Sequence, residues 1–350
     1  MNILISFFFK VLAFFLAITT FIIILIIIIN LSQNRLNTEK FNFKEGNIDS
    51  NNKIVLLKLR GPIFNEPSNS MNIGFFSDLE IIYVNEIKKI LKDLENKNIK
   101  GVIVSIDSPG GSVSATYNLY NAINNYKKNN NITIYFHTNE LLVSGGYWAA
   151  LASDKIFANY GSLVGSIGVR GPDWIYYDNP VSISEGILGQ TIETKKGIKI
   201  FKNIAGKSKD LFDSFRMPTD TELLSLQKIV NSIYDDFVLV VSKNRNIEKE
   251  IIINDIGALI FNAKEAKKNY LIDDVLDIDK AIEALVKKLE LKDYQIIERK
   301  KNKLTFLQQL TSVNFKYYNY FTTKNKVEIC NLLKESVSVI FVQKNYFENC

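Results

Sequence analysis

The hydrophobic pattern separates an apolar N-terminal run from a long region in which strand and helix patterns alternate. Val11 to Ile29 is nineteen residues without a charge, and its polar members are Thr19 and Thr20. About 20 apolar residues span a bilayer. A cleaved signal peptide would have a shorter apolar region and a small-residue cleavage site, and Asn30 to Gln33 offers no such site. The sequence therefore predicts an uncleaved transmembrane anchor over residues 1–30.

The region after the anchor reads as a polar linker followed by an α/β domain. Residues 31–52 are rich in Asn, Lys, Glu and Ser and are expected to form the linker. Beyond them, short β-branched runs alternate with segments whose apolar residues recur at helical spacing. We predict strands over 53–59, 101–106, 132–136 and 155–158, and helices over 79–94, 112–126, 144–152, 219–243 and 262–269. This alternation is typical of α/β architecture with parallel strands.

Composition narrows the kinds of chemistry that the chain can perform. The 350 residues are 47% hydrophobic and 23% charged, which is ordinary for a globular protein and excludes a disordered chain or a multi-span transporter. Two cysteines are too few for a disulfide framework or a cysteine-based metal site. The single histidine, His137, excludes a multi-histidine metal site and leaves one candidate for a Ser–His pair.

Positive charge is concentrated near the C-terminus. Seven Lys and Arg residues and no acid lie between Arg299 and Lys326, among aromatic residues such as Tyr317 and Phe321. One interpretation is a surface for anionic lipid or nucleic acid, and the anchor favours lipid. The other is a solvated face with the aromatic rings packed inward. Basic residues also follow the apolar run more often than they precede it, which by the positive-inside rule would place the bulk of the chain in the cytoplasm.

Two glycine-bearing turns carry the candidate chemistry. The first, Asp107 to Ser112, follows a buried strand and contains two adjacent glycines. Backbone N–H groups in such a turn can hold an oxyanion or a phosphate. Phosphate is the weaker interpretation, because this turn has neither the GxGxxG nor the GKS/GKT pattern of nucleotide-binding loops. The alternative is a plain tight turn.

The second turn places Ser144 at the start of a helix built from small residues. A serine there can act as a nucleophile or simply cap the helix. The α/β-hydrolase motif GxSxG is not present, because position 142 is leucine. His137 lies seven residues upstream, and nothing in the spacing places it beside Ser144. A neutral lysine can replace histidine as the base; candidates are Lys195, Lys196, Lys199, Lys202, Lys207 and Lys209, each of which could instead be a surface charge.

Several motifs in a fixed order resemble one known family. They are SPGGSV at 108–113, SGGYWAA at 144–150, DKIFA at 154–158, GSIGV at 165–169, AKEA at 263–266 and LID at 271–273. On these motifs residues 53–290 resemble the signal peptide peptidase A family, which are membrane-anchored serine peptidases. The resemblance implies a Clp-protease/crotonase-like fold, an α/β superhelix of repeated β-β-α units, here preceded by one N-terminal transmembrane helix.

The resemblance also implies site residues. Ser144 would be the nucleophile, and Gly110 and Gly111 would supply the N–H groups of the oxyanion hole. The segment AGKSKD at 205–210 is similar to the family's lysine segment, so Lys209 would be the base, with Lys207 as the alternative. Ser166 would be an auxiliary residue that orients the lysine. A lysine base predicts an activity that rises with pH.

The family further implies hydrophobic peptide substrates such as cleaved signal peptides, a ring-like homo-oligomer, and a catalytic domain on the outer face of the membrane. It requires no metal, cofactor or nucleic-acid partner. The expected organisation is an anchor at 1–30, a linker at 31–52, a serine peptidase domain at 53–290 and a basic, aromatic extension of unknown role at 291–350. Two alternatives stay open: an inactive membrane scaffold of the same fold, and a crotonase-type acyl-CoA enzyme, which would not need Ser144.

Overall fold

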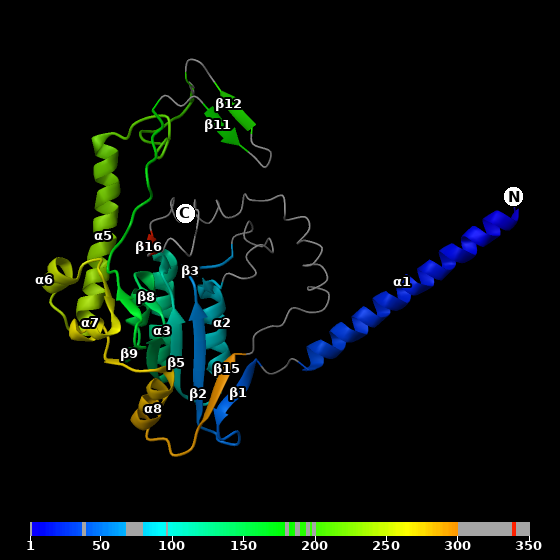
Figure 1. Ribbon diagram of the computed structural model, residues 1–350, viewed down its shortest axis with the longest axis horizontal. Coiled ribbons are helices and arrows are strands. Elements are labelled where there is room, and N and C mark those ends of the chain that lie inside the picture. Colours follow the sequence, from blue (N-terminus) through cyan, green and yellow to red (C-terminus); the bar gives the residue numbers. More distant parts are fainter. Residues whose placement is uncertain are drawn as a thin grey trace.

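The computed structural model describes residues 2–36, 40–67, 80–95, 97–178, 182–185, 190–193, 197, 201–299 and 338–340. Its first element is α1 (Asn2–Leu36), which projects from the rest of the molecule in Figure 1. The segment Ser6–Leu25 has a mean hydropathy of 2.5 and none of it is buried. By length and composition, α1 can cross a membrane, in agreement with the expected N-terminal apolar helix.

A seven-stranded sheet lies at the centre of the fold, in the order β1-β15-β2-β5-β7-β9-β14. Its strands are β1 (Phe41–Gly46), β15 (Gln295–Arg299), β2 (Lys53–Arg60), β5 (Ile99–Asp107), β7 (Thr133–Thr138), β9 (Lys155–Ala158) and β14 (Asp274–Val275). All neighbours pair in parallel except β1, which runs antiparallel to β15. Parallel strands need crossover connections, and helices supply most of them here.

The crossovers follow a repeated β-β-α pattern, which confirms the predicted fold class. β5 is followed by β6 (Gly110–Ser112) and α3 (Val113–Asn130), and β7 by β8 (Leu141–Val143) and α4 (Gly145–Ala150). β2 is followed by two short strands, β3 (Ile63–Phe64) and β4 (Ile82–Tyr83), before α2 (Val84–Leu94). The short second strands form sheets of their own, with orders β16-β6-β3-β4 and β13-β10-β8. They bring the turns after β5 and β7 to the same side of the molecule.

The remaining elements extend this body. They are β10 (Leu163–Gly165), β11 (Ser182–Glu185), β12 (Gln190–Glu193), α5 (Asp220–Arg245), α6 (Lys249–Ile251), η3 (Ile252–Ile256), β13 (Ile260–Asn262), α7 (Ala263–Lys268), α8 (Ile278–Lys288) and β16 (Ser338–Ile340). In Figure 1, α5 runs up from the body toward the β11–β12 hairpin.

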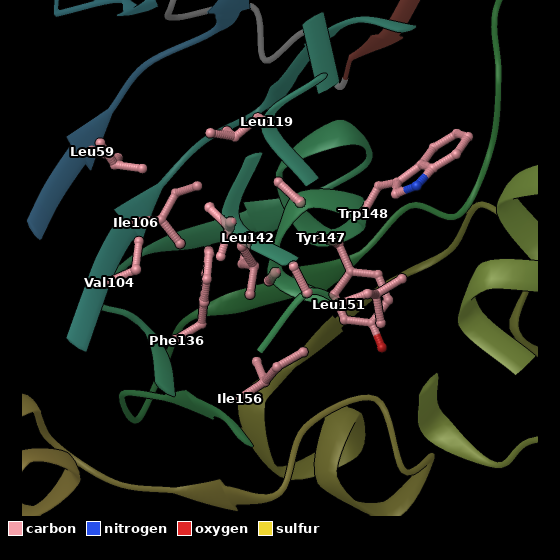
Figure 2. Packing of buried hydrophobic residues seen from close by; sticks show 14 of the residues in the cluster. Leu59, Val104, Ile106, Leu119, Phe136, Leu142, Tyr147, Trp148, Leu151 and Ile156 are labelled. Carbon is pink, nitrogen blue, oxygen red and sulfur yellow. The ribbon is translucent and has the colours of Figure 1, made fainter. Parts of the chain in front are cut away.

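Hydrophobic residues cover both faces of the central sheet, as expected for buried parallel strands. Along β5, Val102, Val104 and Ile106 belong to the larger core cluster, whereas Ile103 belongs to a smaller cluster under α8. Figure 2 shows the larger cluster, in which Tyr147 and Trp148 point in different directions from α4. The side chains of α4 are therefore fixed from two sides.

The sheet extends beyond the range expected from sequence. Residues 41–46 form β1 although they were expected in the linker, and β15 lies beyond residue 290. The physical reason is long-range pairing: β15 inserts between β1 and β2, and Phe41 is buried in the core. The basic segment 299–326 lies outside the described residues except for Arg299.

Asp273 connects three elements at the far edge of this sheet. Its carboxylate accepts hydrogen bonds from the Lys155 ammonium at 2.7 Å, the Ile156 N–H at 2.8 Å and the Arg245 guanidinium at 2.9 Å. Burial raises the pKa of Asp273, but these hydrogen bonds outweigh burial, and the pKa lies below its ordinary value. A pKa that is lower in the folded than in the unfolded state contributes stability above the unfolded pKa, and this stability disappears as pH falls through the folded pKa.

We therefore expect Asp273→Asn to lower the free energy of unfolding at pH 7 by about 2 kcal/mol, because charge-assisted hydrogen bonds are lost. The difference from wild type should shrink as pH falls below about 4, the ordinary range of an unfolded aspartate. Denaturant unfolding in detergent, monitored by circular dichroism, measures the free energy of unfolding of both proteins at each pH. Asp93→Asn, which removes an exposed ion pair with Lys40, is the control; an equal effect there would contradict the prediction.

Candidate active site

Ser144 lies where β8 turns into α4, in a strained backbone conformation. Its φ is 55° and its ψ is −124°, outside the regions that residues with a Cβ normally adopt. The strain is held by two backbone hydrogen bonds: the Ser144 N–H donates to the Gly165 carbonyl at 2.8 Å, and the Trp148 N–H donates to the Ser144 carbonyl at 3.0 Å. Among the described residues, the Ser144 side chain makes no capping hydrogen bond. Strain of this kind is concentrated at functional sites, so the plain N-cap interpretation loses support.

Ser166 occupies the equivalent place on the neighbouring strand. β8 and β10 pair in parallel with Val143 opposite Gly165, so the residues that follow them, Ser144 and Ser166, leave the sheet side by side. Ser166 is also buried and has a positive φ of 55°, and its N–H donates to the Leu259 carbonyl at 2.7 Å. The fold thus brings together the predicted nucleophile and the predicted auxiliary serine.

The glycine turn after β5 lies directly against the start of α4. The Ser108 N–H donates to the Leu141 carbonyl at 2.7 Å, and the Val143 N–H donates to the Ser108 carbonyl at 3.2 Å. A Cβ on Gly146 would lie 2.9 Å from the Ser108 carbonyl oxygen and 3.0 Å from the Ser108 Cβ. Glycine at position 146 therefore allows the two turns to touch, and any larger residue would separate them.

The predicted oxyanion residues belong to this contact region. The Gly110 N–H donates to the Ser108 hydroxyl at 3.2 Å, so within this chain it is already engaged. Gly111 lies in β6 between β3 and β16, opposite Ile63 on one side and Val339 on the other. The C-terminal extension thus returns a strand to the edge of the candidate site, a feature that sequence reasoning missed.

Asp107 begins the first glycine-bearing turn, and the structure gives it a structural role that the sequence did not indicate. A single oxygen of this buried carboxylate accepts hydrogen bonds from the Thr138 hydroxyl and from the N–H groups of Asn139 and Glu140, each at 2.9 Å. Thr138 ends β7, and Asn139 and Glu140 form the connection to β8. Asp107 therefore fixes the strand that ends at Ser144 relative to the glycine turn that follows β5.

α4 packs on the C-terminal half of α5. The Trp148 ring stacks on Phe237 with 4.5 Å between ring centroids and 15° between planes, and the Tyr147 hydroxyl donates to the Leu271 carbonyl at 2.9 Å. Ser144 lies one turn before Trp148. The predicted nucleophile therefore lies near the C-terminal half of α5.

The predicted base lies at the opposite end of α5. Lys207 and Lys209 are both exposed, in a turn that precedes the helix. The Ser208 hydroxyl is hydrogen-bonded to Glu222, in the first turn of α5, which fixes this turn at the helix N-terminus. Lys202 forms an ion pair with Asp213. The candidates Lys195, Lys196 and Lys199 lie outside the described residues.

Within one chain, Ser144 and Lys209 are not brought together. Phe237 lies seventeen positions after Asp220 in this helix, a separation of about 25 Å at the α-helical rise. Figure 1 likewise shows the segment before α5 at the far end of this helix from β8. A lysine side chain cannot span this separation.

His137 occupies a buried position in the central sheet. It is fully buried in β7 with its Nε2 3.0 Å from the Leu276 carbonyl, and within the described residues its Nδ1 has no partner. Burial lowers its pKa, which favours the neutral ring. No group of three His, Cys, Asp or Glu side chains that could hold a metal ion is found in the described part of the chain.

Comparison with known proteins identifies a family model and several relatives that match this chain. A family model described as Peptidase family S49 matches residues 126–292. A protein of Enterococcus faecium named putative signal peptide peptidase SppA is 30% identical over 257 residues, covering 73% of this chain and 70% of that protein. A putative protease of Methanocaldococcus jannaschii is 32% identical over 210 residues, covering 60% of this chain and 63% of the relative.

Solved structures are more distant. A mutant of the 1510-N membrane-bound stomatin-specific protease, in complex with a substrate peptide, is 17% identical, covers 76% of this chain and 98% of its own, and has a TM-score of 0.41. The sequence relatives confirm the expected enzyme class, a serine-type peptidase, and the chain belongs to peptidase family S49.

Proposed function

We propose that this protein is a membrane-anchored serine endopeptidase in which Ser144 attacks the peptide carbonyl and Lys209 of a neighbouring copy accepts the serine proton. The observation that carries the proposal is the strained backbone of Ser144 at the contact of two glycine turns. The lysine acts as base only in its neutral form. The tetrahedral oxyanion would be held by backbone N–H groups of the glycine turn at Gly110 and Gly111, of which the Gly110 N–H here donates to the Ser108 hydroxyl.

The edge of β6 suggests where a peptide would bind. β16 pairs antiparallel with β6, Ser338 opposite Ser112 and Ile340 opposite Gly110, which supports the idea that this edge accepts an extended segment. β16 also approaches α4, the helix that Ser144 begins. A substrate strand paired with β6 in place of β16 would bring its backbone to the nucleophile, with main-chain hydrogen bonds supplying affinity.

The exposure of Lys209 and its distance from Ser144 within one chain both favour a lysine from a neighbouring copy as the base. A water-exposed lysine is charged at neutral pH and is a poor base, whereas burial against another protein surface favours the neutral form. The part of the chain around Lys209 also exposes large apolar side chains, a property typical of protein interfaces. Five of them are Ile175 (47% exposed), Phe201 (92%), Ile204 (52%), Met217 (68%) and Leu224 (57%). We propose that this surface packs on a second copy in a homo-oligomer.

The proposed substrates are hydrophobic peptides in or near a membrane, such as cleaved signal peptides. α1 would hold the catalytic domain at the membrane, where such peptides accumulate, and the anchor would bring it into contact with lipid. We place the catalytic domain on the extracytoplasmic side, following the family resemblance over the weak count of basic residues. The basic segment at 299–326 is proposed to contact anionic lipid.

Labelling with a fluorophosphonate tests the nucleophile in the detergent-solubilised full-length protein. We expect one equivalent of label, located on Ser144 by mass spectrometry, and no label on Ser144→Ala. The matched control is Ser153→Ala, since Ser153 lies just after α4 and donates to the Ala150 carbonyl at 2.7 Å; it should label like wild type. If folded wild-type protein does not label, the serine peptidase mechanism fails, and the inactive scaffold and the acyl-CoA enzyme become the better explanations.

A further inference from the structure

One cluster of charged side chains surrounds the turn that carries Lys209. Arg216 donates two parallel hydrogen bonds to Asp210, from Nε at 2.7 Å and from Nη2 at 2.8 Å. It donates two more to Glu222, from Nη1 at 2.9 Å and from Nη2 at 2.8 Å. Paired bonds of this kind are strong and fix the relative orientation of the groups they join. Arg216 therefore binds the turn and the first turn of α5 at the same time.

Both chain neighbours of Lys209 are held by this cluster. Asp210, which follows it, accepts from Arg216, and Ser208, which precedes it, is hydrogen-bonded to Glu222. Lys209 itself is exposed, so it projects from a turn whose two sides are fixed. This arrangement presents one side chain outward while restricting the backbone beneath it.

The cluster is held in place by its surroundings. The Arg216 guanidinium lies 4.9 Å from the centroid of the Trp174 ring, and the Trp174 indole N–H donates to the Asp213 carbonyl at 3.2 Å. Glu222, only 5% exposed, also accepts the Thr219 N–H at 2.9 Å, completing the capping box of α5. Hydrogen bonds from Arg216 lower the pKa of both Asp210 and Glu222, so both carboxylates are charged at neutral pH.

The turn needs such support because its backbone is unfavourable. Ser208 and Phe212 have φ values of 60° and 64°, in the left-handed region that residues other than glycine rarely adopt. Each such residue carries a conformational cost that the surrounding structure must offset. Without the bonds from Arg216 and Glu222, the turn would relax, and Lys209 would sample many positions.

We infer that Arg216, together with Glu222, is a positioning residue of this peptidase, which fixes the turn that presents Lys209 to the serine of a neighbouring copy. The inference rests on the proposed function, since it assigns Arg216 no role except through Lys209. Lysine at position 216 would keep the charge but cannot reproduce the planar fork that binds two carboxylates.

The test measures peptide hydrolysis by the full-length protein in detergent. We expect Arg216→Lys to lower kcat by roughly 10- to 100-fold, the size of effect that a misplaced catalytic group produces, while KM changes less than about twofold because substrate binds elsewhere. Asp210→Asn, which removes the partner on the other side, should act in the same direction. Arg170→Gln is the matched control, because Arg170 forms an exposed ion pair with Asp173 in the same region.

A double variant separates positioning from general stability. In a Lys209→Ala background, Arg216→Lys should change the residual hydrolysis by less than about twofold, because the group it positions is already gone. A further tenfold loss there, or a shift of the melting temperature that accounts for the loss of activity, would overturn the inference. So would wild-type kcat in both Arg216→Lys and Asp210→Asn while Lys209→Ala is inactive. Full activity of Lys209→Ala would instead refute the proposed base itself.

Discussion

Replacing Ser144 by alanine is expected to lower peptide hydrolysis at least about 1,000-fold, the scale seen when a serine peptidase loses its nucleophile. The reason is chemical, because the variant has no hydroxyl at position 144 to form the acyl intermediate. The fold should survive. Alanine keeps the Cβ of serine at φ 55° and ψ −124°, and the backbone bonds to Gly165 and Trp148 do not involve the side chain.

The measurement is the initial rate on a hydrophobic fluorogenic peptide, with circular dichroism and melting temperature measured on the same samples. Ser166→Ala serves as the comparison within the site, since Ser166 leaves the neighbouring strand beside Ser144 and is proposed to orient the base. The loss of hydrolysis rate in Ser166→Ala should be smaller than the loss in Ser144→Ala. Activity retained in Ser144→Ala would favour a crotonase-type reaction, which relies on an oxyanion hole without a serine nucleophile.

Lys209→Ala should be as inactive as Ser144→Ala, yet a mixture of the two variants should regain activity. If the base comes from a neighbouring copy, an oligomer assembled from equal amounts of both has a complete pair at about a quarter of its sites, by random mixing of subunits around a closed ring. Each complete site combines the serine of the Lys209→Ala chain with the lysine of the Ser144→Ala chain. Co-expression with two affinity tags isolates the mixed oligomers.

The control for this mixture is the doubly substituted chain, Ser144→Ala with Lys209→Ala, co-expressed with wild type. This mixture shows how much activity is lost when wild-type subunits are only diluted by inactive ones. Absence of recovery in the mixed oligomers, with both chains present in the purified complex, would mean that serine and base come from one chain.

The hydrolysis rate of wild type should also rise between roughly pH 6 and 9, because lysine acts as a base only after it loses its proton.

The local pattern of the chain was sufficient to predict the elements that carry the site. The β-branched run at 101–106 became β5, and the small-residue segment after Ser144 became α4, because period and residue size determine these structures over a few residues. The repeated β-β-α order was expected from the family resemblance, whereas the alternation by itself predicted α/β architecture with parallel strands. Short-range preferences act within one element, so a single sequence reveals them.

Long-range pairing was not predictable in this way. β1 and β15 lie more than two hundred residues apart in the chain and are adjacent in the sheet, and β16 reaches β6 from the C-terminal extension. Nothing in a short window of sequence specifies which strand a distant segment will join, because the register depends on the faces that tertiary packing buries. For the same reason the role of Asp107, which depends on the β7–β8 connection lying beside it, was not visible.

The sequence by itself indicated the enzyme class, through the resemblance that SPGGSV and SGGYWAA carry to a family of serine peptidases. It also determined the apolar helix at the N-terminus. Only the tertiary structure decided how the candidate groups lie in space: Ser144 beside Ser166 and against Ser108, and Lys209 at the opposite end of α5. The physical reason is that spacing along a chain fixes neighbours within a turn or two, whereas a rigid helix can separate two motifs by its whole length.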